Sequence, residues 1–74
     1  MWKTEHIQEG DIYFIQVREG EVAKTLERKP DILVDLDAQG KVLAIEVVGS
    51  STTPVGALMS VLNEFGLVEH ASAA

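Results

Sequence analysis

The chain has 74 residues, which is enough for one small domain with a thin hydrophobic core. Twelve acidic residues against six basic ones give a formal charge of −6, so the surface repels phosphate backbones and we expect no nucleic-acid partner. The absence of cysteine excludes disulfides and thiolate metal sites, and no apolar run approaches the length of a membrane span.

The first part of the chain predicts short strands separated by turns. Residues 2–7 form a first candidate strand, and residues 8–11 (QEGD) are typical of a turn. Residues 12–18 (IYFIQVR) are rich in aromatic and β-branched side chains, which suit a half-buried pleated surface. Glu19-Gly20 predicts a two-residue hairpin loop, which would pair residues 22–28 with residues 12–18. The charges within residues 22–28 favour an edge strand.

A second hairpin is predicted after Pro30, which cannot donate to a strand ladder. Residues 32–37 and 41–48 are its strands, and Ala38-Gln39-Gly40 is its turn. In the second strand one face is an apolar row, and the opposite face is apolar except at Glu46; the row consists of Leu43, Ile45 and Val47. This two-sided pattern indicates a central strand.

The pattern then changes to that of a helix, at about residues 54–65. Thr53 is a candidate N-cap, and Pro54 suits the first helical position. Apolar residues follow at spacings of three and four and predict one buried stripe: Val55, Leu58, Met59, Leu62 and Phe65. Gly66 is placed to end the helix, and we expect residues 71–74 to fray.

These elements predict a single α+β domain over residues 1–74, a meander of four or five antiparallel strands with one C-terminal helix packed on one face. One helix cannot cover both apolar faces of the hairpin at residues 32–48. A large uncovered apolar face usually belongs to an interface. We therefore expect a partner.

Two stretches, DIYFIQVREGEVAKT and DILVDLDAQGKVLAIEVVGSS, carry a series of hairpin motifs. The motif residues are Asp11, Tyr13, Val17, Val22, Ala23, Thr25, Val34, Asp35, Asp37, Gly40, Val42, Ile45 and Glu46. The pattern resembles domain-of-unknown-function family 2283 (DUF2283) over about residues 11–50. Residues 6–9 (HIQE) replace the family's tyrosine-aspartate opening, and the C-terminal helix lies beyond the resemblance. The resemblance implies a compact β-rich domain without an established activity, cofactor or catalytic residue. It also implies an antitoxin-like role, because such genes can lie beside small toxin genes.

The segment DLDAQGKVLAIE is close to the calcium loop of an EF-hand, and its candidate ligands are Asp35, Asp37, Gln39 and Glu46. The flanking segments read as strands, however, whereas an EF-hand loop needs helices on both sides. We therefore favour a hairpin without a metal, in which the two aspartates mark the solvent face and Gly40 takes a positive φ.

Other polar residues give weaker indications. His6 and His70 lack any metal-ligand spacing and are expected at the surface. The hydroxyls of residues 50–53 could hold an anion at the helix start, although capping explains them better. Glu46, between two apolar residues, is the acid best placed for burial, which fits an interface or structural residue better than a catalyst.

The sequence thus predicts a non-enzymatic interaction module without a cofactor, and a homodimer is its leading form. A regulatory or antitoxin-like partner of a basic protein is the first alternative, suggested by the acidic charge. Calcium binding at residues 35–46 is the second. Because MWKTEHIQEG lacks the apolar stretch of a signal peptide, we expect a soluble cytoplasmic protein.

Overall fold

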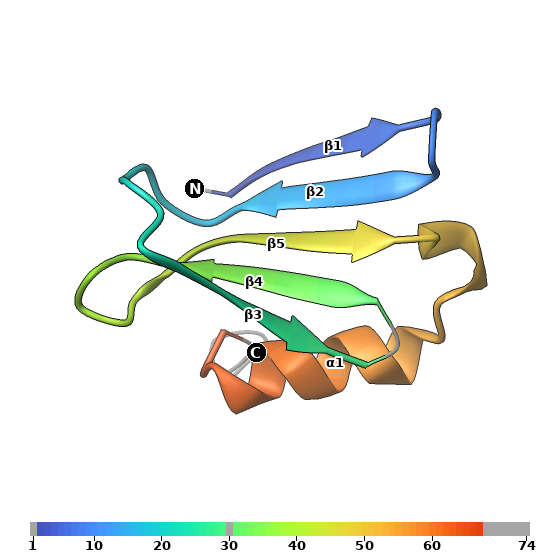
Figure 1. The fold of residues 1–74 in the computed structure, drawn as a ribbon. Helices are drawn as coiled ribbons and strands as arrows, with labels where there is room; N and C mark the ends of the chain where they lie inside the picture. Colours follow the sequence, from blue (N-terminus) through green and yellow to red (C-terminus); the bar gives the residue numbers. More distant parts are fainter. Residues whose placement is uncertain (1, 30, 68–74) are drawn as a thin grey trace.

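The computed structural model describes residues 2–29 and 31–67, which form a five-stranded antiparallel sheet and one α-helix (Figure 1). The elements are β1 (Lys3–Ile7), β2 (Ile12–Gln16), β3 (Lys24–Arg28), β4 (Ile32–Leu36), β5 (Val42–Val48), the 3-10 helix η1 (Ser50–Thr52) and α1 (Val55–Glu64). The predicted α+β class is confirmed. Pro30 and the tail at 71–74 lie outside the described residues. None of the described helices is long and apolar enough to cross a membrane.

The strand order is β1-β2-β5-β4-β3, so the hairpin predicted at Glu19-Gly20 is wrong. β2 and β3 are separated by β5 and β4 instead of pairing with each other. The physical reason is the choice of partner: β5 offers β2 an apolar neighbour at each inward position, with Ile15 opposite Ile45. The charged β3 takes the sheet edge, as its composition predicts.

The connection from β2 to β3, residues 17–23, passes along one end of β5 and β4. The N–H groups of Val17 and Arg18 both donate to the Leu43 carbonyl, at 2.7 and 3.1 Å, and Ala23 N–H donates to the Leu36 carbonyl at 2.8 Å. A Cβ atom at Gly20 would lie 2.8 Å from Leu43 Cδ2, so glycine permits this close crossing.

The core lies between α1 and one face of the sheet. Its fully buried centre is Ile32, Val34 and Ile45. The expected row of Leu43, Ile45 and Val47 is wrong at its first position, because the β4–β5 register shifts next to Leu36. As a result Val42 joins the core cluster, whereas Leu43 is buried outside it.

Helix α1 begins at Val55, one residue later than expected, and Pro54 occupies the N-cap position without a side-chain cap. The predicted Thr53 cap is therefore wrong: its hydroxyl donates to the Gly49 carbonyl at 3.1 Å and closes the turn before the helix. The predicted stripe is correct at three positions that pack on the core: Leu58, Leu62 and Phe65. Val55 and Met59 are exposed, and Val61 is buried instead. Gly66, with φ of 71°, ends the helix as predicted.

Arg28 at the end of β3 fixes α1 to that side of the sheet. Its guanidinium donates to Glu64 through Nε and Nη2, with the shortest contact at 2.7 Å, and lies 5.6 Å from the centre of the Phe65 ring. Hydrogen bonding by Arg28 lowers the pKa of Glu64. The ion pair and the ring contact help to hold α1 on one face of the sheet. The opposite face of the sheet is not covered by this helix.

Candidate functional site

The near-EF segment folds as the β4–β5 hairpin. Asp37 closes the turn, where its carboxylate accepts the N–H groups of Gln39 and Lys41 at 2.9 Å each. These bonds, the Lys41 N–H foremost, lower the pKa of Asp37. Gly40 takes the expected positive φ, of 84°. The turn thus uses the Asp37 carboxylate to bind its own backbone.

The other candidate ligands lie away from that turn. Asp35 accepts the Thr25 hydroxyl at 2.7 Å on the neighbouring strand. Glu46 lies in mid-strand, opposite Leu33 of β4 and Phe14 of β2. Within residues 2–29 and 31–67, no three Asp, Glu or His side chains are grouped so that they could hold a metal ion. The hairpin interpretation explains the positions of all four residues.

Calcium is therefore expected to leave the hairpin unchanged. In amide proton–nitrogen spectra, addition of millimolar calcium should produce no saturable shifts at residues 35–46, because Asp37 is committed to backbone donors and Glu46 is remote from it. Magnesium at equal ionic strength is the control for screening. A saturable shift of Asp35, Asp37 and Glu46 with calcium alone would restore the cation site.

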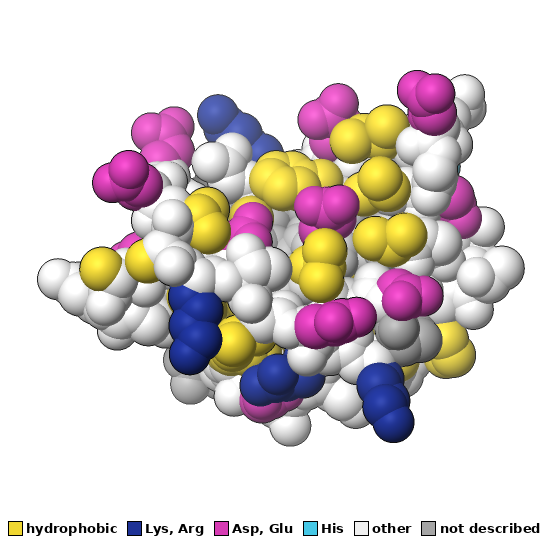
Figure 2. All heavy atoms as spheres, viewed as in Figure 1, with side chains coloured by type: hydrophobic (Ala, Val, Ile, Leu, Met, Phe, Trp, Pro, Cys, Tyr) yellow, Lys and Arg dark blue, Asp and Glu magenta, His cyan; other side chains and the backbone are white. Residues whose placement is uncertain are grey.

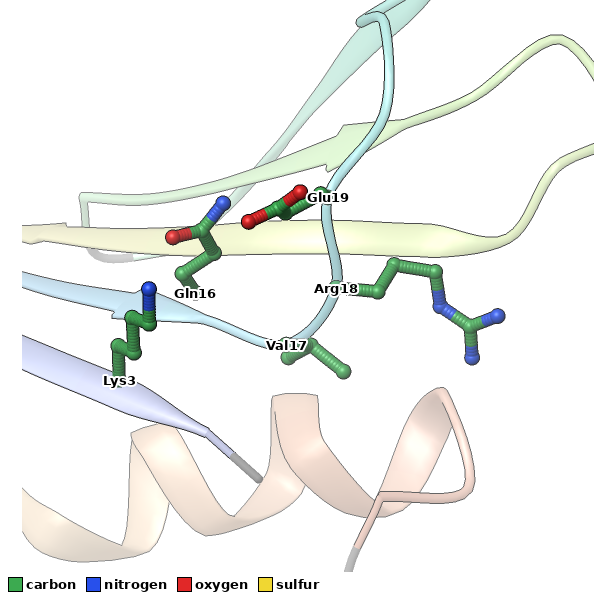
Figure 3. Close-up of a pocket in the computed structure, with 5 residues that line it drawn as sticks. All are labelled: Lys3, Gln16, Val17, Arg18 and Glu19. Atoms are coloured by element: carbon green, nitrogen blue, oxygen red, sulfur yellow. The ribbon is translucent and has the colours of Figure 1, made fainter.

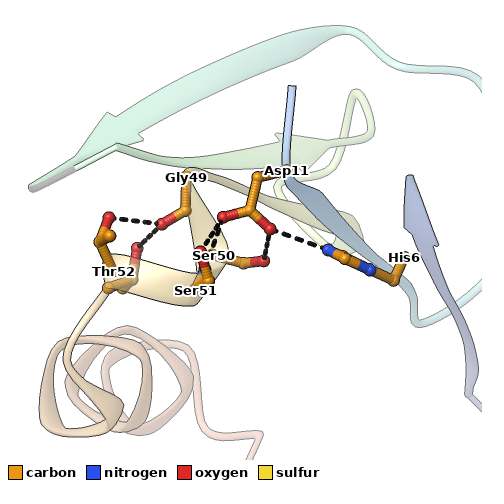
Figure 4. Close-up of polar contacts among 7 residues, drawn as sticks. His6, Asp11, Gly49, Ser50, Ser51 and Thr52 are labelled. Atoms are coloured by element: carbon orange, nitrogen blue, oxygen red, sulfur yellow. Dashed lines mark hydrogen bonds and ion pairs between the residues drawn. The ribbon is translucent and has the colours of Figure 1, made fainter. Parts of the chain in front are cut away.

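A polar cluster that was not predicted surrounds Asp11, between β1 and β2 (Figure 4). Its carboxylate accepts His6 Nε2 at 2.8 Å, the Ser51 N–H at 2.8 Å, and the hydroxyls of Ser50 and Ser51. Its own carbonyl accepts the Ser50 N–H at 2.8 Å. No local pattern in the sequence predicts this cluster, because Asp11 and Ser50 are brought together only by the pairing of β2 with β5.

The cluster joins the turn between β1 and β2 to η1 through the Asp11 carboxylate. The serine and histidine donors, Ser51 foremost, hold the pKa of Asp11 well below its ordinary range. A carboxylate with a lowered pKa is a weak general base for the serine hydroxyls that donate to it. His6 contacts the aspartate rather than a hydroxyl (Figure 4). His6 is exposed, as expected, and His70 lies outside the described residues.

The surface hollows are open and shallow. One of about 300 Å³ lies at the ends of β1 and β2, lined by Lys3, Gln16, Val17, Arg18 and Glu19. Figure 3 shows that the Arg18 guanidinium points away from Lys3 and Glu19, so the charged groups do not converge. A second, of about 250 Å³, lies beside the start of α1. The first hollow therefore supplies no set of convergent charged groups around a small ligand.

The sheet face opposite α1, here called the open face, carries a second set of apolar side chains, which lie outside the core. In Figure 1 β3 is drawn in front of α1, and Figure 2 looks onto the same side, where hydrophobic groups alternate with acidic ones. The alternation of side chains along the strands places two sets of residues on the open face. The apolar ones are Ile7, Ile12, Phe14, Leu33, Ala44 and Val48, and the acidic ones are Glu5, Glu27, Asp35 and Glu46. Ile7 and Val48 are 40% and 37% exposed. No element of the described part of the chain packs on this face as α1 does on the other.

Comparison with known families identifies a match over more than half of the chain. The family described as "Protein of unknown function (DUF2283)" matches residues 8–51, which take in β2 to β5 and end before α1. No curated protein and no solved structure matches the chain. The match includes Asp11 with both serines of its cluster, and most of the open face.

Proposed function

The chain belongs to DUF2283, a family of proteins of unknown function, and on that premise we propose that it is a non-enzymatic protein-interaction module acting through the open face. The observation that carries the proposal is the exposure of an apolar surface on a sheet whose other face is covered. Ile12, Phe14 and Leu33 are only half-buried there, and Ile7 and Val48, which flank Ile12, are more exposed. Exposed apolar side chains gathered on one face and interspersed with polar ones are typical of a binding interface.

The alternative, an enzyme, has less support among the described residues. The cluster that unites serine, histidine and aspartate places the aspartate between the other two, so His6 does not contact a serine hydroxyl there. Glu46 is half-buried on the open face rather than inside a cleft. In a binding role, Glu46 and its apolar neighbours Phe14 and Leu33 would all contact the partner.

Two partners fit an interaction module of this shape. A second copy of the chain would bury the open face against itself and give the homodimer expected from the sequence. A basic protein would use the negative charge as well as the apolar surface, and an antitoxin-like or regulatory role would be one case of it. A cytoplasmic location stays a prediction.

Replacement of the two central apolar residues of the open face should weaken binding strongly. Phe14→Thr with Leu33→Thr places residues that suit strands at both positions but removes the apolar centre, so any association through this face should weaken at least about tenfold. Sedimentation velocity of the purified chain measures self-association. Quantitative copurification with the tagged chain from the cells that make it measures other partners.

The matched control is Val55→Ala with Met59→Ala, which removes exposed apolar side chains from α1. Thermal melts establish that both double variants are folded. If the face variant and the helix variant associate as strongly as the unmodified chain, or if the unmodified chain neither self-associates nor binds a partner, the proposed function is wrong.

A further inference from the structure

A line of alternating acidic and apolar residues crosses the open face from edge to edge. The strand registers pair Glu5 with Phe14, Phe14 with Glu46, Glu46 with Leu33, and Leu33 with Glu27. Each of the five strands contributes one residue, and all five side chains point away from α1. We call this set the acidic row.

The row has a regular spacing. Neighbouring strands lie about 4.8 Å apart, so successive glutamates of the row start about 10 Å apart, with one apolar side chain between them. An apolar row of Ile7, Ile12 and Val48 runs along one side of it. In Figure 2 acidic groups likewise lie among hydrophobic ones across the middle of this face.

Resting on the proposed function, we propose that the open face docks a basic amphipathic segment of another protein. The segment presents Lys or Arg side chains to Glu5, Glu46 and Glu27 and apolar side chains to the hydrophobic residues between them. Apolar contact supplies the buried area, and the complementary charges select the partner. The proposal thus identifies the partner by its charge and amphipathicity.

Charge argues against a second copy on this face. The strand residues that point to it include four carboxylates but one base, Lys3. Lys24 and Arg28 alternate to the helix side, and Arg28 is engaged by Glu64. Two copies placed face to face would bring carboxylates against carboxylates, which disfavours their association. A basic segment removes that repulsion.

The position of Glu46 argues that these carboxylates do more than keep the surface hydrated. Glu46 is half-buried on the central strand, flanked by Phe14 and Leu33 on the two neighbouring strands. A carboxylate held against apolar surface is poorly solvated, and an opposite charge compensates for this. Among residues 2–29 and 31–67, no three Asp, Glu or His side chains are grouped so that they could hold a metal ion, so a metal does not supply that opposite charge.

The test uses a synthetic helical peptide as probe. Its lysines lie about seven residues apart, which is about 10 Å along a helix, and leucines lie between them. The control peptide carries glutamate in place of each lysine. Binding to the full chain is measured by fluorescence anisotropy. We expect Glu5→Gln with Glu27→Gln and Glu46→Gln to weaken binding about tenfold, because three charge pairs are lost.

A second triple variant, Glu9→Gln with Glu19→Gln and Glu21→Gln, makes the same change in net charge at exposed positions outside the strands. It should alter the affinity by no more than about twofold. Equal weakening by the two triple variants would mean that only net charge matters and would overturn the inference. Binding of the control peptide as tight as that of the lysine peptide would also overturn it.

The Phe14→Thr/Leu33→Thr variant separates this inference from the proposed function. If that variant abolishes peptide binding but the acidic-row variant does not, the open face is an interface and the basic partner is wrong. If neither variant affects binding, both proposals fail. A doubled mass of the unmodified chain that Phe14→Thr/Leu33→Thr returns to monomer would assign the face to a second copy and also overturn the inference.

Discussion

Ile45→Ala should lower the free energy of unfolding by about 2–5 kcal/mol. Ile45 is 0% exposed at the centre of the sheet, opposite Ile15 on β2 and Val34 on β4. Truncation to alanine leaves a cavity between two strand pairs and α1. Small domains have only about 5–15 kcal/mol of stability, so the loss is a large share of the total. Guanidinium unfolding followed by circular dichroism measures it.

Val55→Ala is the control for that measurement. Val55 is 77% exposed on α1, so its truncation should change stability by no more than about 0.5 kcal/mol. The comparison tests the arrangement of the core as well as its energy. Equal denaturation midpoints for Ile45→Ala and the unmodified chain would contradict the placement of β5 at the centre of the sheet.

Asp11→Ala should be the most damaging change outside the core, with a fall in melting temperature of roughly 10 °C. The substitution removes the acceptor for His6, Ser50 and Ser51 and leaves alanine at a φ of 51°. Asp11→Asn should be milder, because asparagine tolerates the left-handed region and keeps one side-chain oxygen. The neighbouring exposed Glu9, changed to alanine, is the control.

The same carboxylate makes stability depend on pH with a definite sign. The pKa of Asp11 is lowered in the folded state, so below the ordinary carboxyl pKa of about 4 the unfolded chain binds more protons. The contribution of Asp11 is therefore full near neutral pH and falls as the pH drops from about 5 toward 2. The stability difference between the unmodified chain and Asp11→Asn should narrow over that range. A constant difference would contradict an ionised Asp11 in the cluster.

Much of the fold can be predicted from local patterns in the chain. The five strands and the helix follow from β-branched runs, turn residues and helical spacing, and β5 is correctly predicted as central because both of its faces are apolar. Strand order could not be predicted in this way. The spacing around Glu19-Gly20 fits a hairpin as well as a crossover. Only the choice of which strands pair with β5 decides between the two.

The candidate site was predictable in a similar measure. The uncovered apolar face and the half-buried Glu46 follow from alternation within single strands. The acidic row needs the register of all five strands, and the Asp11 cluster needs β2 beside β5, so neither appears in any short segment. The exposure of Val55 and Met59 was missed because a stripe at helical spacing does not show how much of its length the sheet can cover.

The crossover between β2 and β3 separates the sheet into two parts, β1–β2 and β3–β4–β5, which can form before they pair with each other. The hairpin β1–β2 and the three strands β3–β4–β5 each join segments close in sequence, whereas β2 and β5 pair Ile12 with Val48. Pairing β2 with β5 closes the longest loop and therefore has the largest entropic cost, so it should be a late step in folding. Ile15 and Ile45 meet across this join. Neither local unit completes the core alone, and the domain should therefore gain its stability in one cooperative event when β2 and β5 meet.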